Sequence, residues 1–240
     1  MLRTTRREIL LASASALVVS GVSPGKKLKV VVTGGHPGDP EYGCGGTVAR
    51  YTDLGHEVTF VYLNRGEKGC AGKPQTECGA IRTSEAQKAC SILKAQPAFA
   101  RQIDGEASVN AAAYDEFRHL IESLKPDILF THWPVDGHRD HRAISSLTYD
   151  AWLQSGKTAA FYYYEVSDGE DTLMFAPTDF VDISQTESRK RDACYAHASQ
   201  SPDRFYALQS KVTGFRGTES GYTQAESFIR HSQSRRDLLI

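Results

Sequence analysis

Apolar residues along this chain form short runs, and stretches of helical periodicity separate these runs. The run at 28–33 is rich in β-branched residues and predicts a buried strand. Runs of similar character follow it, and the expected strands are 28–33, 56–63, 127–131, 160–166 and 180–183. The spacing of apolar positions between the runs predicts helices over 45–54, 81–93, 113–124, 143–153 and 185–198.

Strands that alternate with helices predict an α/β fold, namely a Rossmann-like, open, mostly parallel sheet with helices on both faces, in a single domain. Polar residues gather directly after the strands, so a functional site is expected at the carboxyl edge of the sheet. The loop 64–79 is long and Gly-rich, which indicates a binding loop. The polar stretch 214–240 is expected to be an irregular extension over the surface.

The N-terminus carries Arg6 and Arg7, followed by small and apolar residues up to about position 21. This pattern is typical of a twin-arginine export signal and is too short for an ordinary membrane helix. An amphipathic helix fits worse, because the run is apolar or small on every face. We therefore expect an export signal at 1–23 and a domain at 24–240, with its core at about 28–201 and a C-terminal extension at 202–240. The protein is expected to be periplasmic, with no stable membrane span after signal removal.

The charge composition is balanced, with 28 basic and 29 acidic residues among 240 and a net charge of −1. Such a balance gives no general attraction to nucleic acid or to an anionic membrane surface. The length suits one substantial hydrophobic core. Partners are therefore expected to be small molecules or glycans, not nucleic acid, and the sequence leaves the oligomeric state open.

Five cysteines cannot all pair within one chain. Cys70 and Cys78 flank a short polar segment, so in an oxidising compartment they could close a small disulfide. The absence of a CxxC spacing argues against a zinc site made of thiolates.

Two short motifs follow predicted strands: HPGD at 36–39 and HRDH at 138–141. Two imidazoles and one carboxylate from two strand ends can bind a metal ion and leave an open position for water. The predicted ligands are His36, Asp39 and His141, which suit one Zn²⁺, although Fe²⁺, Mn²⁺ or Co²⁺ would also fit. The plainer alternative, that His36 only ends a strand and Asp39 only caps a helix, is weakened by the second cluster at an equivalent position.

Glycines at 43–46 follow the first motif and invite comparison with a dinucleotide-binding loop. The spacing is not GxGxxG, and seven residues separate Gly35 from the first of these glycines. We therefore interpret them as positions where a helix packs tightly. Trp133, at the end of another strand, is either a core residue or a surface on which a sugar stacks, and its neighbour His132 is expected to support the site without binding the metal.

The segment HPGDPEYGCGGTVARYTDLGHEVTFVYLNRGE resembles the opening motif of the PIG-L/LmbE-like zinc-dependent N-acetylglucosaminyl deacetylases, whose usual form is HPDDE followed by GCGGT. The match continues in RTSE at 82–85, in HRDH, and in a C-terminal pattern made of DI at 182–183 and HASQ at 197–200. The resemblance covers about residues 28–201.

The resemblance implies the same three metal ligands and assigns three further roles. His138 would lie near the substrate carbonyl, where it would stabilise the oxyanion or protonate the leaving amine. Asp140 would orient His138. Arg82 would hold the sugar, because its planar fork of donors suits hydroxyls and anionic groups.

The sequence departs from the family at the general base, which is the first acid of HPDDE and is Gly38 here. Loss of a general base typically costs about 10²- to 10⁴-fold in rate. Glu41 and Asp136 are both expected to line the cleft, and either could replace the missing acid. The remaining alternatives are a metal hydroxide that works with His138 alone, or lost catalysis.

Together these features predict an exported, zinc-dependent hydrolase that removes an N-acyl group, in the first place acetyl, from an amino sugar or glycoconjugate. An alternative of a different class is a metal- and glycan-binding protein that has lost catalysis with its first acid. A third reading is hydrolysis of an ester or of another amide.

Overall fold

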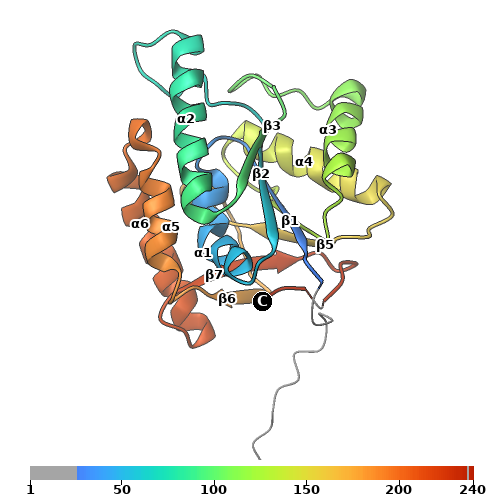
Figure 1. Cartoon of the computed structure of the whole chain (residues 1–240), viewed down its shortest axis with the longest axis vertical. Coiled ribbons are helices and arrows are strands. Elements are labelled where there is room, and N and C mark those ends of the chain that lie inside the picture. The colour runs from blue at the N-terminus through green and yellow to red at the C-terminus, as the bar shows by residue number, and fades with distance from the viewer. Residues whose placement is uncertain (1–25, 237) are drawn as a thin grey trace, which may run out of the picture.

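The computed structural model describes residues 26–236 and 238–240, so the predicted export signal lies outside the described residues (Figure 1). One seven-stranded sheet forms the centre, in the order β3-β2-β1-β4-β5-β7-β6. The strands are β1 (Lys29–Gly34), β2 (Glu57–Tyr62), β3 (Gln96–Phe99), β4 (Ile128–His132), β5 (Ala160–Tyr164), β6 (Asp179–Asp182) and β7 (Ala225–Arg230). The helices are α1 (Asp39–Asp53), α2 (Gln75–Leu93), α3 (Ala111–Leu124), α4 (Arg139–Gln154), α5 (Glu187–Tyr195) and α6 (Pro202–Ser220), with a 3₁₀ turn at Ala198–Gln200.

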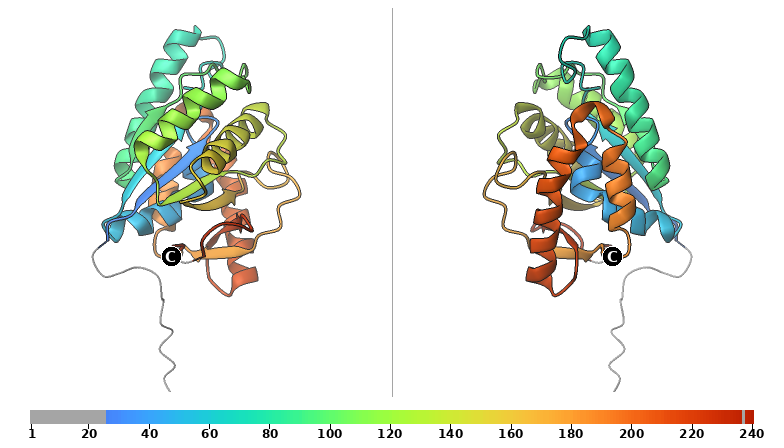
Figure 2. Two further views of the ribbon diagram at one scale, coloured as in Figure 1. Left: turned by 90° about the vertical axis from the view of Figure 1, so that its right-hand side faces the viewer. Right: turned by 90° about the vertical axis from the view of Figure 1, so that its left-hand side faces the viewer.

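The sheet is mostly parallel, as predicted. Strands β3, β2, β1, β4 and β5 run parallel, and β7 is antiparallel to both of its neighbours. Helices α1, α2, α5 and α6 cover one face of the sheet and α3 and α4 cover the other (Figures 1 and 2). Alternate residues of β1 serve the two cores: Val30 and Val32 pack under the first group of helices, and Val31 packs under the second. No helix in the described ranges has the length and apolar character needed to cross a bilayer.

The prediction of an irregular C-terminal extension is wrong. Helix α6 packs on the sheet, and β7 pairs between β5 and β6, where Phe228 lies 5.0 Å from Phe130 between ring centroids. The helix was missed because its buried side includes the polar residues Gln209, Thr213 and Arg216. Apolar periodicity cannot reveal a helix that packs through polar contacts.

Four helices begin earlier than predicted: α1 at Asp39 instead of 45, α2 at Gln75 instead of 81, α3 at Ala111 instead of 113 and α4 at Arg139 instead of 143. Pro40 is compatible with the first turn of α1, where a backbone N–H has no partner within the helix. Glu41 supports this start, because its carboxylate accepts a hydrogen bond from Gly38 N at 3.1 Å. The sequence also missed β3, a short edge strand that contains Pro97.

The glycines of α1 allow close packing, as predicted. A Cβ on Gly43 would lie 2.3 Å from Cδ2 of Tyr164 in β5. A Cβ on Gly46 would lie 2.6 Å from Cγ2 of Ile183. Helix α1 therefore contacts the sheet and the chain after β6 through its backbone.

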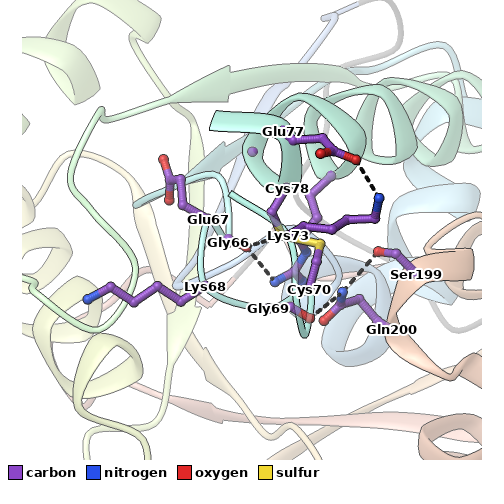
Figure 3. The surroundings of a disulfide bond; sticks show 12 residues. Gly66, Glu67, Lys68, Gly69, Cys70, Lys73, Glu77, Cys78, Ser199 and Gln200 are labelled. Carbon is purple, nitrogen blue, oxygen red and sulfur yellow. Dashed lines mark hydrogen bonds and ion pairs between the residues drawn. A yellow bond between two sulfur atoms is a disulfide. The ribbon is translucent and has the colours of Figure 1, made fainter. Parts of the chain in front are cut away.

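The disulfide between Cys70 and Cys78, which the sequence left open, is present (Figure 3), and the other three cysteines are buried thiols. It joins the loop after β2 to the first turn of α2. Gln200 also holds this loop, because its Nε2 donates to Gly69 O at 3.2 Å. The disulfide therefore fixes the loop that precedes Arg82 in the chain.

We expect Cys70→Ser to lower the free energy of unfolding by about 2 kcal/mol, because the disulfide restricts the unfolded chain. Urea titration with and without a reductant measures this change. The reductant should destabilise the unmodified protein and leave Cys70→Ser unchanged. Titration of the unfolded, oxidised protein with a thiol reagent should find three free thiols, and a count of five would contradict the disulfide.

Candidate active site

A cavity of about 600 Å³ lies at the carboxyl edge of the parallel strands, where both His motifs are. Its titratable and charged lining residues are His36, Asp39, Lys68, Arg82, Asp104, His138, His141, Glu170, Asp171, His197 and Arg204. Tyr42, Val166 and Phe205 contribute apolar surface. The site is therefore at the edge of the sheet predicted from the sequence.

Two of the predicted metal ligands, His36 and His141, lie against one carboxylate oxygen of the third, Asp39. Asp39 Oδ2 lies 3.2 Å from His36 Nδ1 and 3.2 Å from His141 Nε2. His36 follows β1, Asp39 begins α1, and His141 lies in the first turn of α4. All three side chains are at most 14% exposed. Their proximity agrees with the prediction, and their role as ligands stays a prediction.

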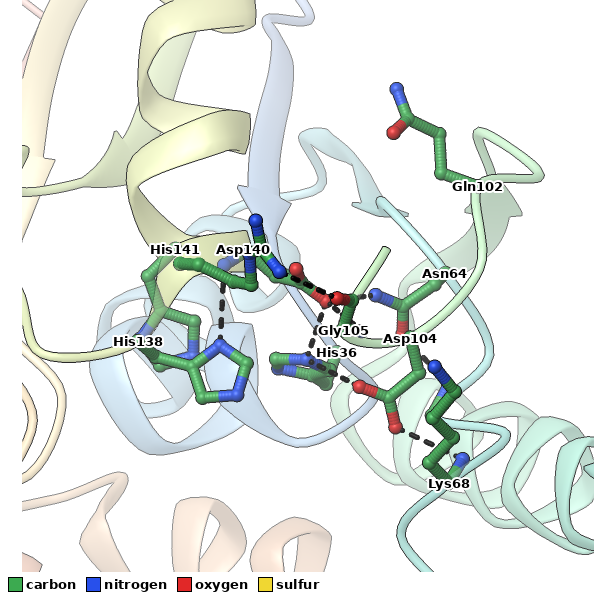
Figure 4. Close-up of polar contacts among 12 residues, drawn as sticks. His36, Asn64, Lys68, Gln102, Asp104, Gly105, His138, Asp140 and His141 are labelled. Atoms are coloured by element: carbon green, nitrogen blue, oxygen red, sulfur yellow. Dashed lines mark hydrogen bonds and ion pairs between the residues drawn. The ribbon is translucent and has the colours of Figure 1, made fainter. Parts of the chain in front are cut away.

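A carboxylate holds the other ring nitrogen of each imidazole, and Figure 4 shows the two carboxylates beside His36. His141 Nδ1 lies 3.0 Å from Asp136 Oδ1. His36 Nε2 lies 3.2 Å from Asp140 Oδ2 and 3.3 Å from Asp104 Oδ1. Metal-binding histidines are usually oriented in this way, with the second nitrogen bonded to a carboxylate or carbonyl. The donor set and its supports therefore fit a divalent metal ion.

The two imidazoles carry protons when no cation competes for them. Burial lowers the pKa of His141, but Asp39 and Asp136 more than offset this effect and raise the pKa to about 9. Burial likewise opposes protonation of His36, and Asp39, Asp104 and Asp140 raise its pKa well above the usual value. A metal ion that binds these nitrogens replaces the protons, so binding is expected to release protons.

His132 brings a third imidazole to the same carboxylate. Its Nε2 lies 3.2 Å from Asp39 Oδ2 and accepts a hydrogen bond from Gly35 N, and its ring stacks on His141 at 4.0 Å. Burial, and then the charge of His141, lower the pKa of His132 to about 4. His132 is therefore neutral at pH 7.

The described residues contain three overlapping groups whose possible ligand atoms lie within 4.8 Å of one another. The groups are His36–His138–His141, Asp39–His132–His141 and His36–Asp104–Asp140. Every group includes His36 or His141, but none contains His36, Asp39 and His141 together, so the groups locate a possible metal site without selecting the predicted ligand set.

His138 lines the cavity as a neutral hydrogen-bond donor. Its Nδ1 accepts from Asp140 N at 3.2 Å, and because a backbone N–H can only donate, the ring proton is on Nε2. Burial, and then the charges of His36 and His141, lower the pKa of His138. The carboxylate of Asp140 bonds to His36 instead of the His138 ring, so only the backbone of Asp140 orients His138 as the resemblance implied.

The expectation that Glu41 and Asp136 line the cleft is wrong. Glu41 is fully buried and accepts hydrogen bonds from Gly38 N and from Tyr62 Oη, and its Oε1 lies 3.0 Å from His197 Nε2. Asp136 accepts from His138 N at 2.7 Å and contacts the imidazole of His141. Neither residue is among those that line the cavity, and both carboxylates are occupied by hydrogen bonds to its walls.

The two predicted substrate-binding residues differ in position. Arg82 lines the cavity and donates from Nη2 to Pro37 O at 2.7 Å, and its buried Nε has no hydrogen-bond partner. Trp133 is not among the cavity residues and packs edge-on against Tyr163 and Phe175. The structure thus places Trp133 with the packing residues.

Gly38 occupies the position that the resemblance assigns to the general base. Its φ of +114° favours glycine, and a Cβ there would have no atom nearer than 3.8 Å. Sequence reasoning also missed two cavity carboxylates, Asp104 and Asp171. Asp104 follows β3 and could have been found if that strand had been predicted, whereas Asp171 lies in an irregular loop after β5 and has no sequence signal.

Comparisons with known proteins relate this chain to proteins described as deacetylases. A sequence model of the PIG-L family, described as GlcNAc-PI de-N-acetylase, matches residues 31–152. A diacetylchitobiose deacetylase of Thermococcus kodakarensis is 26% identical over 82% of this chain and 81% of its own length. A probable N-acetyl-alpha-D-glucosaminyl L-malate deacetylase 2 of Bacillus anthracis is 26% identical over 83% of this chain and 91% of its own length.

The fold is similar to that of N,N'-diacetylchitobiose deacetylase from Pyrococcus horikoshii, with a TM-score of 0.76 at 23% identity, over 85% of this chain and 83% of that one. The family match begins within β1, covers both His motifs and ends near the end of α4. The chain therefore belongs to the PIG-L family of de-N-acetylases, which are enzymes that hydrolyse amide bonds.

Proposed function

We propose that this protein is an exported, zinc-dependent deacetylase that removes acetyl groups from N-acetylated amino sugars. The observation that carries the proposal is the position of Asp39 Oδ2, 3.2 Å from both His36 Nδ1 and His141 Nε2, at the wall of a cavity. The relatives named for diacetylchitobiose and for GlcNAc-malate support an amino-sugar substrate. A cavity of about 600 Å³ is within the usual range for small-molecule sites.

His36, Asp39 and His141 would hold the zinc ion. A bound zinc ion of this kind polarises the amide carbonyl and lowers the pKa of its water. Asp136 and the pair Asp104 and Asp140 keep the two imidazoles in the orientation that such binding needs.

His138 would stabilise the transition state as a hydrogen-bond donor. Its Nε2–H is free to donate to the amide oxygen while that oxygen gains negative charge. Because its pKa is lowered, His138 is neutral at pH 7 and is poorly suited to protonate the leaving amine. A second group must therefore carry that proton.

Export is proposed from the Arg6-Arg7 segment, which lies outside the described residues. The Cys70–Cys78 disulfide is consistent with an oxidising compartment.

The first test is acetate release from N-acetylglucosamine, diacetylchitobiose and GlcNAc-malate by the zinc-loaded protein. We expect release by the unmodified protein and loss of both bound zinc and turnover in His141→Ala, because the variant lacks one of three ligands. His119→Ala, at an exposed histidine of α3, is the matched control and should change neither.

Full zinc content in His141→Ala would contradict the assigned ligand set. A zinc-loaded protein that binds these sugars without releasing acetate would contradict the deacetylase proposal and indicate a binding protein.

We expect Asp136→Asn to lower zinc affinity about 10- to 100-fold without unfolding the protein, because the variant loses the carboxylate that orients His141. Competition with a chromogenic chelator measures the affinity, and circular dichroism verifies the fold. Asp115→Asn, on the exposed side of α3, controls for the loss of one negative charge. Equal zinc affinity in the two variants would show that Asp136 does not support the site.

A further inference from the structure

We propose that Asp171 accepts the proton of the attacking water and delivers it to the leaving amine, and so replaces the acid that is missing at Gly38. This inference rests on the proposed deacetylase function. It assigns the general base to the loop after β5, on a different part of the chain from the HPDDE motif.

Among the described residues, four carboxylates line the cavity, and all of them except Asp171 contact a basic group. Asp39 lies between the two predicted metal-binding imidazoles. Asp104 contacts His36 Nε2 and accepts a hydrogen bond from Lys68 N at 3.1 Å. The remaining acid, Glu170, also has a partner, so Asp171 is left as the candidate.

Glu170 is exposed, and its carboxylate pairs with Arg204 at 2.9 Å. By contrast, the carboxylate of Asp171 is partly buried and has no hydrogen bond or ion pair in residues 26–236 or 238–240. Its oxygens are therefore free to accept a proton from a water molecule in the cavity.

Backbone contacts fix Asp171 beside the segment that carries His138. Asp171 O accepts a hydrogen bond from Gly137 N at 2.8 Å. The next residue, Thr172, forms a β-bridge with Asp136 and also donates from Oγ1 to its carboxylate. The loop after β5 is therefore attached to the same turn that positions His138 and Asp136.

A buried ion pair anchors the beginning of this loop, directly after β5. Arg216 of α6 donates two hydrogen bonds of 2.7 Å to the carboxylate of Glu165, which directly follows β5. Arg216 also bonds to Asp168 at 3.1 Å. A carboxylate carried by a loop held at both ends can keep the orientation that proton transfer requires.

The electrostatic environment suits reversible protonation near neutral pH. Burial raises the pKa of Asp171 to about 6. The charge of His141 from α4 lowers the pKa, whereas Asp39 from α1, Asp136 after β4 and the adjacent Glu170 raise it. At pH 7 the group is mostly ionised and can accept a proton, and its protonated form is acidic enough to donate to an amine nitrogen.

The proton balance of hydrolysis then closes with Asp171 alone. The water oxygen bonds to the amide carbon while one water proton passes to Asp171, and the carbonyl oxygen becomes negative and accepts a hydrogen bond from His138 Nε2. Asp171 gives this proton to the nitrogen, the C–N bond breaks, and acetic acid and the free amine are released. The acid ionises in solution and the amine takes up the proton, so Asp171 ends as a carboxylate.

The activity test compares Asp171→Asn with Asp115→Asn, at an exposed acid of α3 that does not line the cavity. We expect Asp171→Asn to lower kcat about 10²- to 10⁴-fold at pH 7 with unchanged zinc content, and Asp115→Asn to stay near the unmodified rate. The kcat of the unmodified protein should fall with decreasing pH as Asp171 takes up a proton, and this fall should be absent in Asp171→Asn. Undiminished kcat in Asp171→Asn would overturn the proposal.

A second test needs no turnover and so separates this inference from the proposed function. Acetohydroxamic acid gives up a proton when it binds zinc as hydroxamate, and calorimetry in buffers of different ionisation enthalpy counts the protons released. Because a hydroxamate anion beside Asp171 raises the pKa of that carboxyl, the unmodified protein should retain this proton on Asp171, and Asp171→Asn should release up to one more proton per site. Equal proton release by the two proteins would overturn the role of Asp171, even if no tested sugar is a substrate.

Discussion

The site depends on the placement of two imidazoles around one buried carboxylate oxygen. Strands β1 and β4 are neighbours in the sheet, so the residues that follow them meet at its carboxyl edge. The carboxylate of Asp39 is stabilised at this position because α1 begins there, and the partial positive charge of a helix N-terminus favours a negative group. The other carboxylates of the site, which contact the two imidazoles, balance the positive charge of these rings when they are protonated.

Burial decides which acids can take part in chemistry. A buried carboxylate is tolerated only with hydrogen bonds or opposite charge, and each such bond occupies a lone pair that a base would need. Asp136, Asp140 and Glu41 are all fully or nearly fully buried, and each has partners that explain its presence. The carboxylate of Asp171 is partly buried and has no partner among the residues that the structure describes, so its lone pairs stay available to accept a proton and burial raises its pKa.

The sequence predicted the features that depend on local pattern. Apolar runs located the strands that precede His36 and His141, and the mostly parallel orientation of the strands followed from their alternation with helices. The segments that were missed depend on tertiary contacts: α6 packs through Arg216 and other polar groups, and β3 is a short edge strand. The orientation of Glu41 could not be predicted either, because Tyr62 and His197, which contact it, lie far from it in the chain.

The glycine in the first motif changes the shape of the site as well as its chemistry. A side chain at Gly38 would enter the space between the cavity and the rings of Tyr42 and His197, and its positive φ would be strained for any other residue. The first turn of α1 is nonetheless stabilised, because Glu41 bonds to the backbone of Gly38 whatever side chain is there. The loop after β5 brings Asp171 to the same cavity and is tied to the turn before α4, so the proton acceptor can change its place in the chain while the imidazoles and Asp39 keep theirs.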